Sequence, residues 1–125
     1  MNLSSLEQNT SGNRIKGRVA EVGGHNINRL VPTDRKPMVG AWCFFDHAGP
    51  MHFAANQGLR VRPHPHIGLQ TFTWMLDGEI LHRDSLGYSQ VITQGQVNLM
   101  TAGKGIAHSE DSVRNGDSLH MAQLW

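Results

Sequence analysis

Short runs of alternating apolar and polar residues, separated by turn residues, make up most of this chain. The runs that predict strands are Arg18–Val22, Asn26–Leu30, Val39–Phe45, Leu59–Pro63, Gln70–Leu76, Glu79–Asp84, Gln90–Thr93, Val97–Thr101, Ile106–Glu110 and Leu119–Trp125. The pair Asp77-Gly78 is a hairpin signal, and Gly95 and Gly103 mark further turns. No stretch keeps an apolar period of 3.6 residues, so the pattern predicts an all-β antiparallel barrel or sandwich.

The length of 125 residues is that of one domain. Residues 1–14 are polar and rich in turn formers, and they predict a flexible N-terminal lead-in to a folded domain over residues 15–125. The segment Leu119–Trp125 alternates like a strand up to the last residue. We expect this segment to pair either with its own sheet or with another subunit.

Composition narrows the cellular setting. The formal charge is +1 without a long charge block, which gives no support for direct nucleic-acid binding. The apolar runs are too short to span a membrane, and the first residues lack the features of a secretory signal. A single Cys43 cannot form an intrachain disulfide. These features predict a soluble cytoplasmic protein, and the 8 histidines direct attention to metal or proton chemistry.

Two pairs of ligand-type residues have the same spacing. His64 and His66 flank Pro65, and His108 is followed two positions later by Glu110. On a β-strand, positions i and i+2 point to the same face, so two such pairs on adjacent strands would bring three imidazoles and one carboxylate to one point. The alternative is a pair of exposed loop histidines, and Pro65 argues against it by restraining the backbone. The pattern predicts a metal site with open coordination positions.

The rule that every second residue of a strand shares a face also applies to the residues after His66, which include two aromatic ones. If the strand continues unbroken from His64, then Phe72 and Trp74 share the histidine face. The face would also include Gly68 and Gln70, whereas Thr71, Thr73 and Met75 would point the other way. The alternatives are that Phe72 and Trp74 are ordinary core, or that a bulge at Gly68 resets the register. Among the unpaired histidines, His47 is the one we expect nearest the site.

The ligand types limit the choice of metal. Imidazole and carboxylate ligands without sulfur suit Fe(II), Mn, Ni, Zn or Cu. Closed structural zinc sites usually use thiolates, which this chain lacks in number. We expect Fe(II), because histidine–carboxylate sites with open positions are used for oxygen chemistry.

Longer segments resemble a known family. Residues 62–69 and 100–110, with residues 44–50 and 81–87, resemble the pirin branch of the cupin superfamily over roughly Arg14 to Trp125. The resemblance implies a single cupin-type antiparallel β-barrel, jelly roll-like, with iron held by His64, His66, His108 and Glu110. The carboxylate of other cupins would fall near Gln70, and in a pirin-type site Glu110 takes its place.

The length departs from the family pattern. The resemblance implies two cupin barrels for a pirin, and this chain resembles the N-terminal barrel only, so we expect a domain that is truncated relative to two-barrel pirins. The surface that a second barrel covers would then be exposed, which favours pairing. We therefore expect a homodimer, or strand exchange near the C-terminus, in place of the missing second barrel. A monomer in light scattering at high concentration would contradict this expectation.

The resemblance implies a function and two alternatives. The first is an Fe(II)-dependent dioxygenase of the quercetin 2,3-dioxygenase type, with a small aromatic substrate such as a flavonol and Glu110 as fourth ligand and base. The second is a metal- or redox-dependent binding or transcriptional co-regulator module. The third is an inactive truncated pirin fragment.

Overall fold

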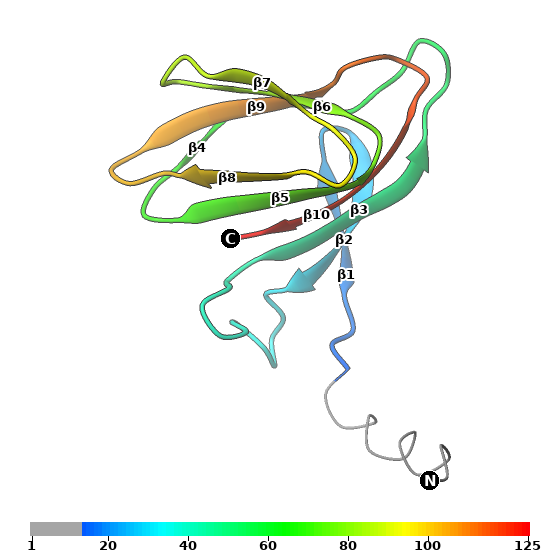
Figure 1. Cartoon of the computed structure of the whole chain (residues 1–125). Coiled ribbons are helices and arrows are strands. Elements are labelled where there is room, and N and C mark those ends of the chain that lie inside the picture. Colours follow the sequence, from blue (N-terminus) through cyan, green and yellow to red (C-terminus); the bar gives the residue numbers. More distant parts are fainter. Residues whose placement is uncertain (1–13) are drawn as a thin grey trace, which may run out of the picture.

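The computed structural model describes residues 14–125, which contain ten strands and no helix (Figure 1). The lead-in predicted for residues 1–14 lies outside the described residues except for Arg14. The strands are β1 (Arg18–Val22), β2 (His25–Val31), β3 (Phe45–His52), β4 (Arg60–His66), β5 (Gln70–Asp77), β6 (Ile80–Asp84), β7 (Ser89–Ile92), β8 (Val97–Thr101), β9 (Ile106–Ser112) and β10 (Ser118–Leu124). Within residues 14–125 no helix is long and apolar enough to cross a membrane.

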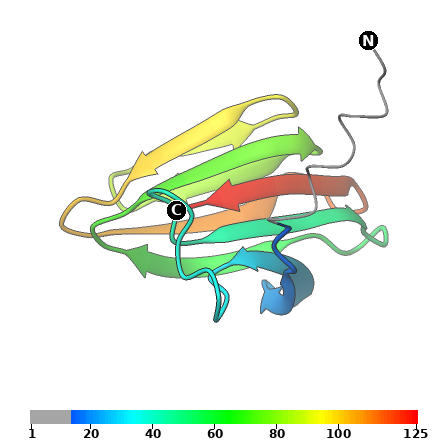
Figure 2. The ribbon, with the colours of Figure 1, turned by 90° about the horizontal axis from the view of Figure 1, so that it is seen from below.

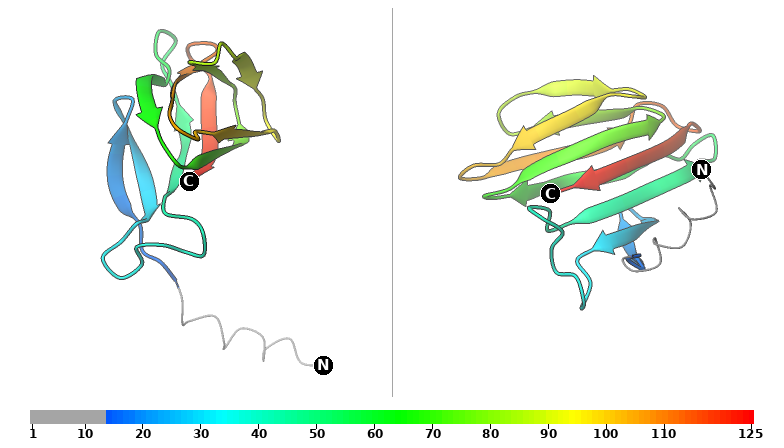
Figure 3. Two further views of the ribbon diagram at one scale, coloured as in Figure 1. Left: turned by 90° about the vertical axis from the view of Figure 1, so that its left-hand side faces the viewer. Right: turned by 60° about the horizontal axis from the view of Figure 1, so that its bottom comes forward.

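The strands form two antiparallel sheets that face each other (Figure 1). The larger sheet has the order β1-β2-β3-β10-β5-β8, and its strands lie side by side in Figure 2. The smaller sheet has the order β4-β9-β6-β7. The hairpin of β1 and β2 extends the larger sheet at one edge (Figure 3). The all-β antiparallel class predicted from the sequence is confirmed.

The core lies between the sheets and takes side chains from both. Met75 and Leu119 come from the larger sheet and Ile80 and Ile92 from the smaller one, and all four are at most 1% exposed. Strand β9 shows the pattern most clearly, because its buried and half-buried residues alternate along its whole length. Such a period of two places every second side chain of β9 between the sheets.

Most predicted strands overlap observed ones, but the strand predicted over Val39–Phe45 is wrong. Val39 and Trp42 instead pair in an isolated bridge around a turn at Gly40, whose φ is +57°. The strand in this region is β3, which carries Gly49 and Pro50 in its interior. Proline has no N–H to donate, and the β3–β10 ladder shifts register opposite this pair, between Leu119 and Met121. This irregularity makes a breaker sequence compatible with a strand.

The last strand is central in its sheet. β10 pairs with β3 on one side and with β5 on the other, so both of its edges are occupied within the chain (Figure 2). A second copy cannot add to β10 without displacing one of these neighbours. The homodimer therefore stays a prediction, and a dimer that leaves the sheet intact would use a surface other than the edge of β10.

Candidate metal centre

Three histidines meet between adjacent strands of the smaller sheet. His64 and His66 come from β4 and His108 from β9, and the antiparallel register places His64 opposite His108. One ring nitrogen from each lies within 4.8 Å of the others. The Nε2 atoms of His66 and His108 are 3.0 Å apart. The structure therefore brings these three predicted site residues together.

Local backbone geometry directs the β4 histidines to this point. The β4–β9 register shifts between Val61 and His64, just before the His-Pro-His segment. The Nδ1 of His64 lies 3.0 Å from the carbonyl oxygen of Arg62. Because a carbonyl oxygen only accepts, Nδ1 of His64 carries the proton and Nε2 keeps its lone pair. A neutral His64 is thus held in the tautomer that binds a metal through Nε2.

Glu110 lies on the same face of β9 as His108, and it is 3% exposed. The side-chain amide of Gln123 donates to both carboxylate oxygens, at 2.8 and 3.0 Å. Glu110 forms a second group of ligand atoms with His108 and His82, again within 4.8 Å of one another. The four predicted ligands thus fall into two overlapping groups that share His108.

Burial and neighbouring histidines lower the pKa values of His108 and His66. Burial, followed by the charges of His64, His66 and His82, lowers the pKa of His108 to about 3. Burial and the neighbouring His64 also lower the pKa of His66. Neutral imidazoles present the lone pairs that metal ions require, so no proton has to leave these rings at neutral pH.

Burial shifts the pKa of Glu110 in the opposite direction to that of the histidines. Burial raises the pKa of its carboxyl group, and the Gln123 hydrogen bond and the nearby His64 and His82 offset part of that rise. A buried carboxylate without a counter-charge is costly, so a cation placed beside Glu110 would be stabilising. The group therefore combines neutral nitrogen donors with an oxygen donor that favours positive charge.

Sequence reasoning missed several residues around this centre. His82, which the spacing of the two ligand pairs does not include, is 4% exposed and lies against His108. Its relation to Asp84 repeats the i, i+2 spacing of the two pairs that were recognised, and that signal was available. The roles of Gln123 and Thr73, whose hydroxyl lies 3.5 Å from Glu110, depend on pairing between distant strands.

The aromatic face predicted beside the histidines is wrong. Gly68 has a φ of +68° and separates β4 from β5, which belong to different sheets. As a result Thr73 faces inward, while Trp74 is 45% exposed on the outside. Gln70 is also exposed and donates to the hydroxyl of Thr101 at 2.9 Å. The break at Gly68, which was one of the alternatives, resets the parity.

His47 does not join the histidine group. Its Nε2 lies 2.7 Å from Nε2 of His120, and neither residue belongs to the ligand groups formed by the described residues. The aromatic neighbour of the centre is instead Trp125, which packs on Phe44. The indole of Trp125 is edge-on to His66 at 6.3 Å and stacks on Phe44 at 5.1 Å. On the other side, the guanidinium of Arg29 lies 5.2 Å from the centre of the Phe44 ring.

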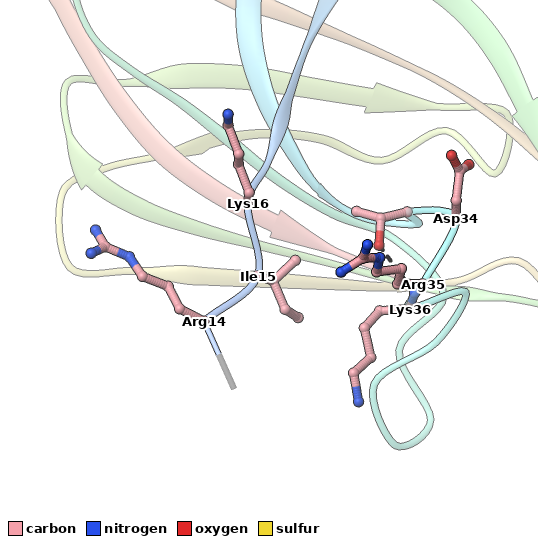
Figure 4. Close-up of a pocket in the computed structure, with 7 residues that line it drawn as sticks. Arg14, Ile15, Lys16, Asp34, Arg35 and Lys36 are labelled. Carbon is pink, nitrogen blue, oxygen red and sulfur yellow. Dashed lines mark hydrogen bonds between the residues drawn. The ribbon is translucent and has the colours of Figure 1, made fainter. Parts of the chain in front are cut away.

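A separate hollow of about 520 Å³ lies beside the segment that precedes β1 (Figure 4). Arg14, Lys16, Arg35 and Lys36 line it together with Asp34, so its charge is mainly positive. None of the described residues that line it belongs to the histidine group. The hollow is therefore distinct from the candidate metal centre.

Two facing antiparallel sheets with a histidine cluster between adjacent strands define a cupin-type protein. The model of the family described as "Pirin" matches residues 24–125. The chain therefore belongs to the pirin family, and the resemblance inferred from the sequence is confirmed.

Relatives and solved structures agree with this assignment. A Pseudomonas aeruginosa protein named "putative quercetin 2,3-dioxygenase" is 61% identical over 90% of this chain and 36% of its own length. A crystal structure of quercetin 2,3-dioxygenase from Acinetobacter baumannii is 57% identical, with a TM-score of 0.84, over 87% of this chain and 37% of that one. The bacterial pirin YhhW from Escherichia coli, solved in complex with nickel(II), is 25% identical with a TM-score of 0.68, over 87% of this chain and 47% of that one. The chain thus spans less than half the length of these proteins.

Proposed function

We propose that this chain is the metal-binding barrel of a pirin-type dioxygenase and that His64, His66, His108 and Glu110 hold an Fe(II) ion. The observation that carries the proposal is the pair of overlapping ligand groups that share His108. The names of the Pseudomonas and Acinetobacter relatives support the reaction class.

The donor set fits a divalent transition metal. Three neutral imidazoles and one carboxylate are the ligand types of iron, manganese, nickel, zinc and copper sites. A six-coordinate ion held by four protein atoms would leave positions for substrate and O₂. The nickel(II) complex of YhhW supports binding of such a metal by a related protein. We prefer Fe(II) for this chain because open histidine–carboxylate sites favour oxygen chemistry on iron.

The residues around the centre suit a planar aromatic substrate with an acidic hydroxyl. A bound Fe(II) would supply Lewis acidity and the capacity to exchange electrons with O₂. Glu110, whose pKa is raised by burial, can accept the flavonol hydroxyl proton on a carboxylate oxygen. Gln123 holds that carboxylate in place through two hydrogen bonds. Trp125 and Phe44 form an apolar wall beside His66 against which an aromatic ring can stack.

The replacement Glu110→Gln is expected to remove the base while keeping the shape of the side chain. With Fe(II) at saturating concentration, the rate of flavonol-dependent O₂ consumption should fall by roughly 10²–10⁴-fold, the usual contribution of a positioned base. The measurement is an oxygen electrode trace together with the loss of flavonol absorbance. Glu79→Gln is the matched control, because that carboxylate pairs with the exposed Arg114 on the surface.

The same assay separates the alternatives. Protein that binds metal but turns over no flavonol with iron, manganese, nickel or copper would contradict the dioxygenase and favour a metal-dependent binding module. Protein that takes up no metal would favour an inactive fragment. A Glu110→Gln variant with wild-type turnover would contradict the role of Glu110 alone.

A further inference from the structure

A buried histidine–aspartate pair lies behind His108, on the side away from His66. His82 and Asp84 belong to β6, which lies beside β9 (Figure 1). The register of these two strands places Asp84 opposite His108. The side chains of both residues are 5% exposed. The Nε2 of His82 is 3.1 Å from the Asp84 carboxylate, and its Nδ1 is 3.3 Å from Nδ1 of His108.

Asp84 is fixed by the turn that follows it. One carboxylate oxygen, Oδ1, accepts hydrogen bonds from the backbone amides of Leu86 at 3.0 Å and Tyr88 at 3.2 Å. The other oxygen, Oδ2, remains for His82. Burial opposes ionisation, but the hydrogen bonds from His82 and the two amides outweigh it and hold the pKa of Asp84 below its usual value. The carboxylate is therefore ionised near neutral pH and only accepts hydrogen bonds.

The direction of each hydrogen bond follows from this acceptor. His82 donates its Nε2 proton to Asp84, and its Nδ1 is then the acceptor of the ring. Asn98 supports this assignment independently, because its amide nitrogen, a donor, lies 3.4 Å from the same Nδ1. The nitrogen of His108 that faces this lone pair then carries a proton. The other nitrogen of His108, Nε2, keeps its lone pair on the side of His66.

We propose that Asp84 and His82 form a hydrogen-bonded chain that holds His108 in the tautomer whose Nε2 binds the metal. Both are positioning residues that act through His108. Metal-bound histidines commonly donate their other N–H to a carboxylate or carbonyl, and here a second imidazole connects the two. The inference rests on the proposed metal centre and adds residues that nothing in the ligand motif includes.

The replacement Asp84→Asn tests this hydrogen-bonded series, because asparagine has almost the same shape as aspartate. The turn amides of Leu86 and Tyr88 require an acceptor at one side of residue 84, so the new NH₂ group has to face His82. His82 would then accept at Nε2 and carry its proton on Nδ1, and His108 would have to place its own proton on Nε2. The dissociation constant for Zn(II) or Ni(II), measured by competition with a chelator, should rise by ~10–100-fold.

Two further measurements distinguish control of the His108 tautomer by Asp84 and His82 from a general loss of structure in the variant. Long-range ¹H–¹⁵N NMR spectra of the metal-free protein should show His108 protonated on Nδ1 in the wild type and on Nε2 in Asp84→Asn. Adding His82→Asn to Asp84→Asn should restore most of the affinity, because the asparagine oxygen can accept from His108 whatever residue stands at position 84. Asp111→Asn is the matched control, since Asp111 lies on β9 but pairs outward with Arg83 at 3.3 Å, and its affinity should stay unchanged.

The outcomes separate this inference from the proposed function. Wild-type protein that binds neither Zn(II) nor Ni(II) would overturn the metal centre. If the wild type binds metal and Asp84→Asn binds it with unchanged affinity, the hydrogen-bonded series of Asp84, His82 and His108 would be contradicted. The proposed metal centre would not be. A loss of affinity with an unchanged His108 tautomer and no recovery in the double variant would also contradict the hydrogen-bonded series.

Discussion

Replacing His108 by alanine is expected to abolish stoichiometric uptake of divalent metal. His108 is the residue that the two ligand groups share, so its loss leaves each of them with two members. The decrease in affinity should exceed the ~10–100-fold typical of residues that only support a ligand. Elemental analysis of protein purified after growth with added iron, together with a chelator titration, measures both quantities.

Two further alanine variants show whether the loss of metal is specific to His108. His64→Ala keeps His108, the ligand that belongs to both groups, so we expect it to weaken binding less than His108→Ala does. His52→Ala changes an exposed histidine at the end of β3 and should leave the metal content unchanged. A His108→Ala variant that is folded by circular dichroism and keeps its metal would contradict the assignment of the centre.

The sequence predicted strands correctly where buried and more exposed side chains alternate. The prediction was wrong where the backbone pairing is irregular. Along β9 the buried positions occupy every second residue, so its period of two was visible in the sequence. Across β3 the breakers Gly49 and Pro50 hid a strand, because the register shift that accommodates them comes from the partner strand β10. A residue's neighbours in a sheet are set by distant segments, and local pattern carries little information about them.

The site shows the same division between local and long-range information. The spacing of His64 with His66 and of His108 with Glu110 placed each pair on one face, and the β4–β9 register joined three of these residues. His82 has equal local spacing with Asp84 but was not recognised, because its role depends on the pairing of β6 with β9. The parity argument failed at Gly68 since one residue with φ of +68° ends the strand on which it relied.

Acidification of the metal-free protein is expected to lower its free energy of unfolding from about pH 6.5 downward. The pKa of His108 is about 3 in the folded protein, against 6.5 for an unperturbed histidine. Between these two values the unfolded chain binds a proton that the folded chain does not, so stability is full above pH 6.5 and declines as the pH falls. Burial lowers the pKa values of His66 and His47 as well, and they add to the same trend.

Glu110 acts in the opposite direction. Its pKa is raised by burial above the ordinary 4.5, so between 4.5 and that raised value the folded protein binds the extra proton, and stability contributed by Glu110 grows as the pH falls. Urea denaturation at a series of pH values from neutral to mildly acidic measures the sum. Each proton taken up on unfolding contributes a slope of at most about 1.4 kcal/mol per pH unit.

Two variants separate these opposing contributions. His108→Gln removes the most strongly shifted histidine and should flatten the decline between pH 6.5 and pH 4.5. Glu110→Gln removes the opposing group and should make the decline steeper between pH 4.5 and the raised pKa of the folded carboxyl group. Stability of the Glu110→Gln variant that is independent of pH in this range, or that rises on acidification, would mean that burial does not lower the pKa values of His108 and His66. These imidazoles would then be protonated below about pH 6.5, and a metal ion would have to displace their protons there.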